Sequence, residues 1–163
     1  MIKPEEVYKA AKKKERENLR FGSFLKNHAD DEELDQQFLA LHNELFERYD
    51  CSQCANCCRA YSTVLEEDEI SAISDHLGMT PESFREKYLI QGEDGLELKD
   101  PCTFLQDDGR CRIESCKPKQ CREYPYTDKS GRLFSLYGIL TSAEHCPVVY
   151  EILERLKKIY QFR

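Results

Sequence analysis

The chain has 163 residues, a formal net charge of -7 and a hydrophobic fraction of 40%. This length allows the chain to bury a core of its own, and the acidic balance argues against general affinity for nucleic-acid phosphates or anionic membranes. No apolar stretch approaches the roughly 18 residues that span a bilayer, and residues 1–20 lack the apolar core of a signal peptide. We therefore expect a cytoplasmic protein that binds neither nucleic acid nor membrane.

A helix is predicted over residues 4–28, because Pro4 suits the first turn of a helix and good helix formers follow it. This stretch also carries a basic run: Lys12, Lys13, Lys14, Arg16 and Arg20. Acidic residues are interspersed with the run, at Glu15 and Glu17. We therefore interpret it as a solvated helix face rather than a nucleic-acid patch.

A second helix is predicted to start near Asp30 or Asp31 and to lead directly into the first cysteines. Four apolar residues share one stripe of this helix: Leu34, Phe38, Leu41 and Leu45.

Two short helices are predicted after the first cysteines. Ile70, Ile73 and Leu77 share one face of the first helix, which is predicted to end at Gly78, a residue typical of helix C-caps. Thr80 and Pro81 then predict the N-cap and first position of the next helix. The inward residues of that helix are Phe84 and Tyr88.

Strands are predicted from residue 96 onward. Leu96 and Leu98 alternate with charged residues, as in a strand. Residues 102–113, CTFLQDDGRCRI, predict two short strands joined at Asp108-Gly109, which is a hairpin signal.

The C-terminal part is predicted to contain a strand over residues 132–137 and then a helix capped by Thr141 or Ser142. Apolar residues keep a spacing of three or four along that helix: Val149, Ile152, Leu156 and Ile159. Together the elements predict one α+β domain over residues 1–163, with an N-terminal helical segment (1–49), a cysteine-cluster core (50–147) and a C-terminal helix (142–163).

The nine cysteines carry the strongest chemical signal. In a reducing compartment, clustered cysteines more often bind metal or perform redox chemistry than form disulfides, and an odd number would leave one thiol unpaired. Residues 51–58 read CSQCANCC, which is two C-x2-C turns in tandem followed by a further cysteine. Each such turn supplies two sulfurs to one metal ion.

Five more cysteines follow: Cys102, Cys111, Cys116, Cys121 and Cys146. Cys102 and Cys111 flank the predicted hairpin, and Pro147 places Cys146 at the start of a helix. Two four-thiolate zinc sites would use eight cysteines, whereas C-x2-C-x2-C with a remote Cys-Pro is also typical of a [4Fe–4S] cluster. Cysteine spacing alone leaves both metals open.

These cysteine blocks resemble the YkgJ-type CxxCxxCC cysteine-cluster family, a zinc- or iron-chelating domain. The resemblance rests on CSQCANCC, on CTFL at Cys102, on CRIE at Cys111, on CKPKQCREYP from Cys116 and on Cys146-Pro147. It implies a metal set of eight cysteines: Cys51, Cys54, Cys57, Cys58, Cys102, Cys111, Cys121 and Cys146. Cys116 departs from the family pattern and is the candidate spare thiol.

We therefore expect a metal-binding protein whose cysteine thiolates chelate zinc at one or two sites in a structural role. One alternative is an iron–sulfur protein with a redox or protein-modifying role, and another is an adaptor that docks a protein partner on residues 4–28. His145 is the best histidine candidate for a ligand, and Arg122 is a candidate cation beside the thiolates. No serine elbow or Cys-His-Asn arrangement can be recognised, so enzymatic activity stays open.

Overall fold

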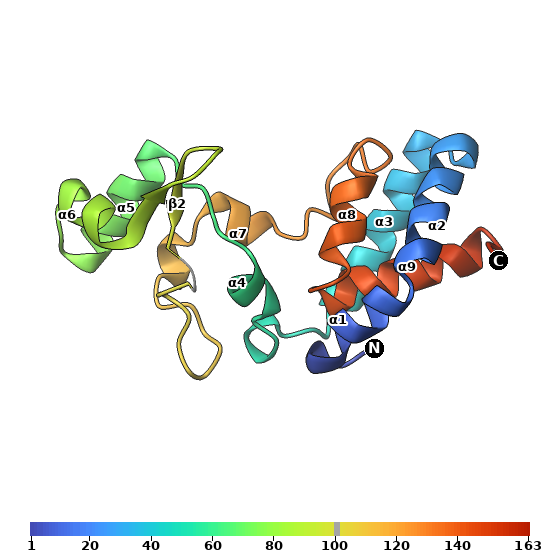
Figure 1. Ribbon diagram of the computed structural model, residues 1–163, viewed down its shortest axis with the longest axis horizontal. Coiled ribbons are helices and arrows are strands. Elements are labelled where there is room, and N and C mark those ends of the chain that lie inside the picture. Colours follow the sequence, from blue (N-terminus) through green and yellow to red (C-terminus); the bar gives the residue numbers. More distant parts are fainter. Residues whose placement is uncertain (100–101) are drawn as a thin grey trace. The chain divides into compact units, whose positions relative to one another are not determined.

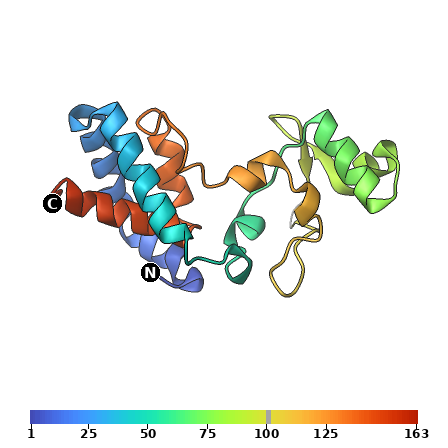
Figure 2. The same cartoon turned by 180° about the vertical axis from the view of Figure 1, so that it is seen from behind.

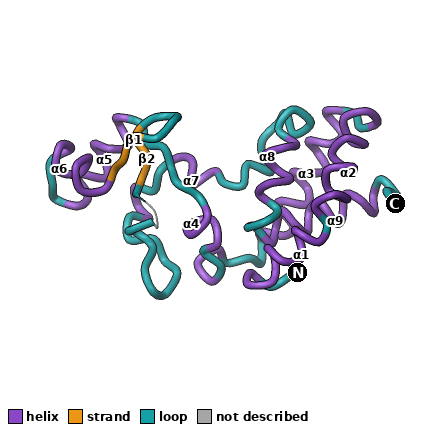
Figure 3. Tube along the Cα trace, in the orientation of Figure 1, coloured by secondary structure: helices purple, strands orange, loops and turns teal. Residues whose placement is uncertain are grey.

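The computed structural model describes residues 1–99 and 102–163, and its contacts gather in two compact units. The helical unit comprises residues 1–50 and 125–163, and the cysteine unit comprises residues 51–124 (Figure 1). Most regular structure is helical, and the described residues contain one two-stranded antiparallel sheet (Figure 3). The predicted α+β class is confirmed, and the prediction of a single domain stays a prediction.

Five helices form the helical unit: α1 (Pro4–Lys13), α2 (Glu15–His28), α3 (Asp31–Phe46), α8 (Leu136–Ser142) and α9 (Pro147–Ile159). Helix α9 packs on α1, α3 and α8, and α8 also packs on α2 (Figure 2). The largest fully buried side chains between them are Phe21, Leu25, Leu34, Phe38, Leu136, Ile152 and Leu153. The core of this unit is therefore a helix-on-helix apolar interface.

The predicted apolar stripe of α3 is confirmed, since Leu34, Phe38, Leu41 and Leu45 are all buried. Asp30 caps this helix, because its carboxylate accepts hydrogen bonds from the backbone N–H groups of Glu32 (3.1 Å) and Glu33 (3.0 Å).

The single helix predicted over residues 4–28 is wrong, because the chain breaks at Lys14 into α1 and α2. Lys14 leaves helical geometry (φ -102°, ψ 6°) while its N–H still bonds to the carbonyl of Ala11. Its ammonium group forms an ion pair with Glu154 of α9. A tertiary contact therefore accompanies a break for which the local sequence has no glycine or proline signal.

The strand predicted over residues 132–137 is also wrong. The carboxylate of Asp35 accepts hydrogen bonds from the backbone N–H groups of Gly131 (2.7 Å) and Arg132 (2.8 Å), so these donors are not available for strand pairing. The chain turns there and enters α8 at Leu136.

Helix α9 starts later than predicted. Its N-cap is Cys146 and its first residue is Pro147, whereas Thr141 and Ser142 lie in α8. The predicted placement of Pro147 in the first turn is confirmed, and the cap at Thr141 or Ser142 is wrong. Of the predicted apolar stripe, Val149, Ile152 and Leu156 are buried, whereas Ile159, the last residue of the helix, is exposed.

The cysteine unit has its own apolar cluster, built on α5 (Glu67–Leu77), α6 (Pro81–Tyr88), β1 (Leu89–Gln91) and β2 (Leu96–Leu98). Strand β2 pairs with β1 in antiparallel register and, on its other edge, forms a bridge from Glu97 to Val64. The buried members of the cluster are Leu65, Ile70, Ile73, Phe84, Tyr88, Leu89, Leu98, Phe104 and Ile113. Four shorter helical pieces complete the unit: η1 (Cys51–Gln53), α4 (Asn56–Ala60), η2 (Glu114–Cys116) and α7 (Lys119–Glu123).

The caps predicted for α5 and α6 are confirmed. Gly78 ends α5 in the left-handed conformation (φ 66°). The hydroxyl of Thr80 accepts a hydrogen bond from the N–H of Ser83 (3.2 Å) at the start of α6, where Pro81 is the first residue.

Residues 102–113 turn back at Asp108-Gly109 as predicted, but they do not form two strands. The described residues of this segment make one isolated bridge, between Leu105 and Cys111.

In the described parts of the chain, no helix has the length and apolar character needed to cross a membrane.

Candidate metal centre

The CSQCANCC segment folds as a short 3-10 turn, η1, followed by the start of helix α4. The N–H groups of Cys54 (3.1 Å) and Ala55 (2.9 Å) both donate to the carbonyl of Cys51. Ala55 then adopts the left-handed conformation (φ 51°), and α4 begins at the next residue. An alanine in this conformation is strained.

Gly109 places the second cysteine block, residues 102–111, directly against the turn that begins at Cys51. It has a φ of 84°, and a Cβ atom added to it would lie 1.8 Å from the carbonyl oxygen of Ser52. The N–H of Gly109 donates to the carbonyl of Gln106 (2.9 Å), and Asp108 accepts from the N–H of Arg110 (3.0 Å). Only glycine allows both the turn and the close approach, so the turn of residues 106–110 is fixed on the Cys51 turn.

Three hydrogen bonds hold the third cysteine block, residues 116–124, beside residues 63–69. The carboxylate of Glu69 accepts from the N–H of Lys119 (2.7 Å), and the side chain of Gln120 accepts from the N–H of Val64 (3.3 Å). The hydroxyl of Thr63 lies 3.1 Å from the sulfur of Cys121. Cys121 is therefore positioned by the strand-like segment that follows the first cysteine block.

The pKa of the Cys58 thiol is lowered from its ordinary value. A hydrogen bond from Cys57 lowers the pKa of Cys58 to about 6, against the opposing effect of burial. The cationic groups of Lys117 and Arg59 lower it further, while Glu114 raises it. At neutral pH Cys58 is thus mainly a thiolate, which is the form that binds metal.

The pKa values of the Cys111 and Cys121 thiols are raised rather than lowered. Burial raises the pKa of both thiols, and the hydrogen bonds from the Ile113 N–H and from Thr63, respectively, offset only part of that effect. The charge of Cys102 also raises both values, and that of Cys58 raises the pKa of Cys121. These thiols therefore affect one another electrostatically, and a bound cation would favour the thiolate form of each.

Lys117 is the cation that these thiols share. Burial lowers the pKa of Lys117, but the carboxylate of Glu114 and the thiols of Cys111 and Cys58 together raise it above its ordinary value. Its ammonium group lies 3.4 Å from a carboxylate oxygen of Glu114, and its side chain is 24% exposed. The candidate centre is therefore a set of thiols around one half-buried ammonium group.

Sequence reasoning named Arg122 rather than Lys117 as the cation beside the thiols. In the structure the guanidinium of Arg122 donates to the backbone carbonyl of Lys117 and so helps to hold that residue. The sequence reasoning also missed Thr63 and the close approach of Gly109 to Ser52. The Asp108-Gly109 hairpin signal was the available hint for Gly109, whereas no local signal marked Thr63.

The predicted ligands divide between the units. Cys146 lies in the helical unit as the N-cap of α9, and the other predicted ligands lie in the cysteine unit: Cys51, Cys54, Cys57, Cys58, Cys102, Cys111 and Cys121. His145 stacks on Tyr8 within the helical unit, with ring centroids 5.9 Å apart. Cys116 packs against the apolar cluster, as do Cys102 and Cys111.

In residues 1–99 and 102–163, no three His, Cys, Asp or Glu side chains lie close enough together to hold one metal ion. The donor chemistry nevertheless suits a thiophilic metal, because the grouped side chains are cysteines and one of them has a strongly lowered pKa. Loading a metal would require the sulfur atoms to move closer together, which couples binding to local folding.

Comparison with known proteins gave one family. The family model CxxCxxCC, described as "Putative zinc- or iron-chelating domain", matches residues 50–147. No curated protein and no solved structure matches the chain.

Proposed function

Because the chain belongs to the CxxCxxCC family, whose description supports metal binding, we propose that the cysteine unit binds zinc through thiolates in a structural role. In this proposal the metal holds the CSQCANCC segment to the cysteine blocks of residues 102–111 and 116–121. Cys146 remains a predicted ligand whose contribution the experiment below tests separately.

The observation that carries the proposal is the burial pattern of the first cysteine block. Within residues 51–60, all of which the structure describes, Ala55 is the one buried residue, at 4% exposure. That residue is also the strained one, with a φ of 51°. Apolar burial therefore contributes little to holding this segment, while four cysteines lie in it. A structural metal would supply the missing stabilisation.

The electrostatics support a thiolate centre. The lowered pKa of Cys58 favours its thiolate form, and Lys117 supplies a compensating positive charge close to Cys58 and Cys111. Four thiolates around a Zn²⁺ ion leave a net charge of about -2, so a nearby ammonium group stabilises the loaded state. Zinc prefers closed tetrahedral thiolate sites when its role is structural.

The test is metal content per chain, measured by elemental analysis on protein purified without oxygen. We expect about one or two zinc ions per chain and no visible absorption band. Cys54→Ser and Cys58→Ser should lose zinc, while Cys116→Ser should retain it. Cys146→Ser tests whether Cys146 is a ligand. Full zinc content in this variant would mean that the centre is confined to the cysteine unit, and reduced zinc content would mean that Cys146 contributes to it.

Iron with matching acid-labile sulfide would contradict the zinc assignment and favour an iron–sulfur protein. A chain that holds no metal at all, with the Cys116→Ser variant indistinguishable from Cys58→Ser, would contradict metal binding itself.

A further inference from the structure

The basic run at the start of the chain separates, in the structure, into paired and unpaired cations. The ammonium group of Lys12 lies 3.0 Å from carboxylate oxygens of both Glu15 and Glu144. Lys14 pairs with Glu154. Lys12 and Lys14 are thus paired with neighbouring acids, whereas Lys13, Arg16 and Arg20 have no acidic partner among the described residues.

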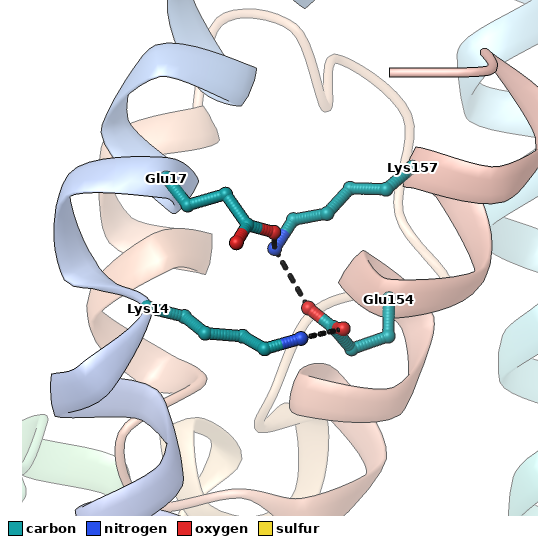
Figure 4. A network of polar contacts seen from close by, with 4 residues as sticks. All are labelled: Lys14, Glu17, Glu154 and Lys157. Carbon is teal, nitrogen blue, oxygen red and sulfur yellow. Dashed lines mark hydrogen bonds and ion pairs between the residues drawn. The ribbon is translucent and has the colours of Figure 1, made fainter. Parts of the chain in front are cut away.

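A network of four charged residues, Lys14, Glu17, Glu154 and Lys157, joins the start of α2 to α9 (Figure 4). Lys157 is almost completely buried and donates to Glu17 (2.6 Å) and to Glu154 (2.7 Å), while Lys14 also donates to Glu154. Two acids and two bases cancel within this network. Glu17 therefore does not neutralise the arginines on either side of it in the sequence.

The end of the chain adds a third arginine to the same place. Phe162 packs against Phe21 and Phe24, with ring centroids 5.1 Å and 5.3 Å apart. Its N–H donates to the carbonyl of Lys157 (2.8 Å), which fixes the turn after α9. The guanidinium of Arg20 lies 5.7 Å from the centre of the Phe162 ring, a cation–π distance.

Arg163 follows Phe162, and both residues line a hollow on the surface of the helical unit. The hollow has a volume of about 470 Å³ and is lined by Arg16, Glu17, Arg20, Phe162 and Arg163. Like charges at positions i and i+4 of a helix repel, so Arg16 and Arg20 destabilise α2 unless an anion lies between them. Three arginines therefore line one hollow of a chain whose formal net charge is -7.

We propose that this arginine hollow, lined by Arg16, Glu17, Arg20, Phe162 and Arg163, binds the phosphoryl group of a phosphomonoester. A dianion with three terminal oxygens can accept hydrogen bonds from three forked guanidinium donors at once, whereas a carboxylate has two oxygens to offer. The Phe162 ring orients Arg20 and gives the substituent of the ester an apolar wall. The volume is in the range of small-molecule sites, which is roughly 300–1,000 Å³.

The proposal is tested by titrating the full chain with inorganic phosphate at constant ionic strength, followed by backbone amide NMR. We expect saturable shifts in residues 16–20 and 162–163. The double variant Arg16→Gln/Arg20→Gln should weaken binding by about tenfold or more, because each charge-assisted contact is strong.

A matched control removes two exposed positive charges elsewhere in the helical unit. Lys26 and Arg48 are exposed and have no ion pair among the described residues. Lys26→Gln/Arg48→Gln changes the net charge equally and should alter the affinity by less than about twofold, since neither residue lines the hollow and exposed charges are screened by salt. Equal weakening in both double variants, or shifts that never saturate, would overturn the proposal.

The source of the phosphoryl group is resolved by two further titrations. Tighter binding of glucose 6-phosphate than of inorganic phosphate would support a free metabolite, and tighter binding of a phosphoserine peptide would support a phosphorylated protein. Binding of neither ester, while phosphate binds, would overturn the assignment to a phosphomonoester. The metal content of the cysteine unit does not enter any of these measurements.

Discussion

Helix α9 and the CSQCANCC segment illustrate two ways of holding a chain in place. Helix α9 buries seven residues against its neighbours, among them Val148, Val149, Ile152, Leu153 and Leu156. Residues 51–60 bury Ala55 alone, in a strained conformation. The difference indicates that the helical unit is stabilised by apolar packing, and that the cysteine unit needs a further source of stability at its first cysteine block.

Removing the metal should have the largest effect and should be confined to one unit. Structural zinc contributes apparent free energies of about 10–16 kcal/mol in small zinc domains. We therefore expect a strong chelator to abolish the dispersed amide NMR signals of residues 51–60 and 106–121, while signals from Leu34 and Ile152 stay in place. Unchanged signals in the first block after complete zinc removal would mean that the comparison between the units is wrong.

A cavity created in the core of the helical unit should destabilise that unit and leave zinc binding unchanged. Phe38 is fully buried in α3, and replacing a buried phenylalanine with alanine costs about 3–5 kcal/mol. We expect Phe38→Ala to lower the free energy of unfolding of the helical unit in urea, followed by the amide signals of α3 and α9. Zinc content should stay at the level of the unchanged chain; a parallel loss of zinc would show that the units do not behave independently.

Gly109 provides a sharper test within the cysteine unit. Gly109→Ala combines a positive φ with a clash against the Ser52 carbonyl, whereas Gly78 has a similar φ (66°) and no atom within 4 Å of an added Cβ. The backbone strain alone costs about 1–2 kcal/mol, and overpacking adds about 1–3 kcal/mol.

We therefore expect Gly109→Ala to weaken zinc binding in a competition titration with a chelating indicator, and Gly78→Ala to lower stability without changing zinc affinity. If both variants keep the same zinc affinity, then the contact between Gly109 and Ser52 does not position the cysteine blocks.

The smallest effect is expected in the charged network of the helical unit. Burial alone would raise the pKa of Glu154, but hydrogen bonds from Lys14 and Lys157 outweigh it and lower that pKa below the usual glutamate value. A lowered pKa in the folded state stabilises the fold above the unfolded-state pKa, and this stability is lost as the pH falls through the folded-state value. Glu154→Gln should cost about 1–3 kcal/mol at neutral pH and should reduce the loss of stability on acidification.

Glu151→Gln is the matched control on the same helix. Glu151 pairs with Arg155 at 3.1 Å, one helical turn away, and such pairs contribute about 0.2–0.5 kcal/mol. Urea unfolding at several pH values distinguishes the two variants. Identical pH profiles for Glu154→Gln and the unchanged chain would contradict the role of Glu154.

Much of the fold could be predicted where a local signal agrees with the packing. The stripe on α3, the Gly78 cap and the Thr80-Pro81 helix start all combine periodicity with residues that suit helix ends. The break at Lys14 and the turn at Gly131 could not be predicted, because partners distant in the sequence decide them. Glu154 pairs with Lys14, and Asp35 accepts the donors of residues 131 and 132.

The candidate site shows the same division. The cysteine spacing predicted the thiols as metal ligands, and Asp108-Gly109 indicated the turn between two of them. Thr63 beside Cys121 depends on pairing across 58 positions of the sequence, and Lys117 became the shared cation only through the fold. Spacing predicts which groups can bind, whereas tertiary contacts decide what surrounds them.

The most direct test of the central claim is cobalt substitution of the zinc-stripped full chain, read by absorption spectroscopy. Thiolate coordination predicts a sulfur-to-cobalt charge-transfer band in the near ultraviolet together with the visible bands of tetrahedral Co²⁺. We expect these bands to saturate in the unchanged chain and in Cys116→Ser, and to be lost in Cys58→Ser. Cobalt that binds without the charge-transfer band, or with equal intensity in Cys58→Ser, would contradict a thiolate metal centre in the cysteine unit.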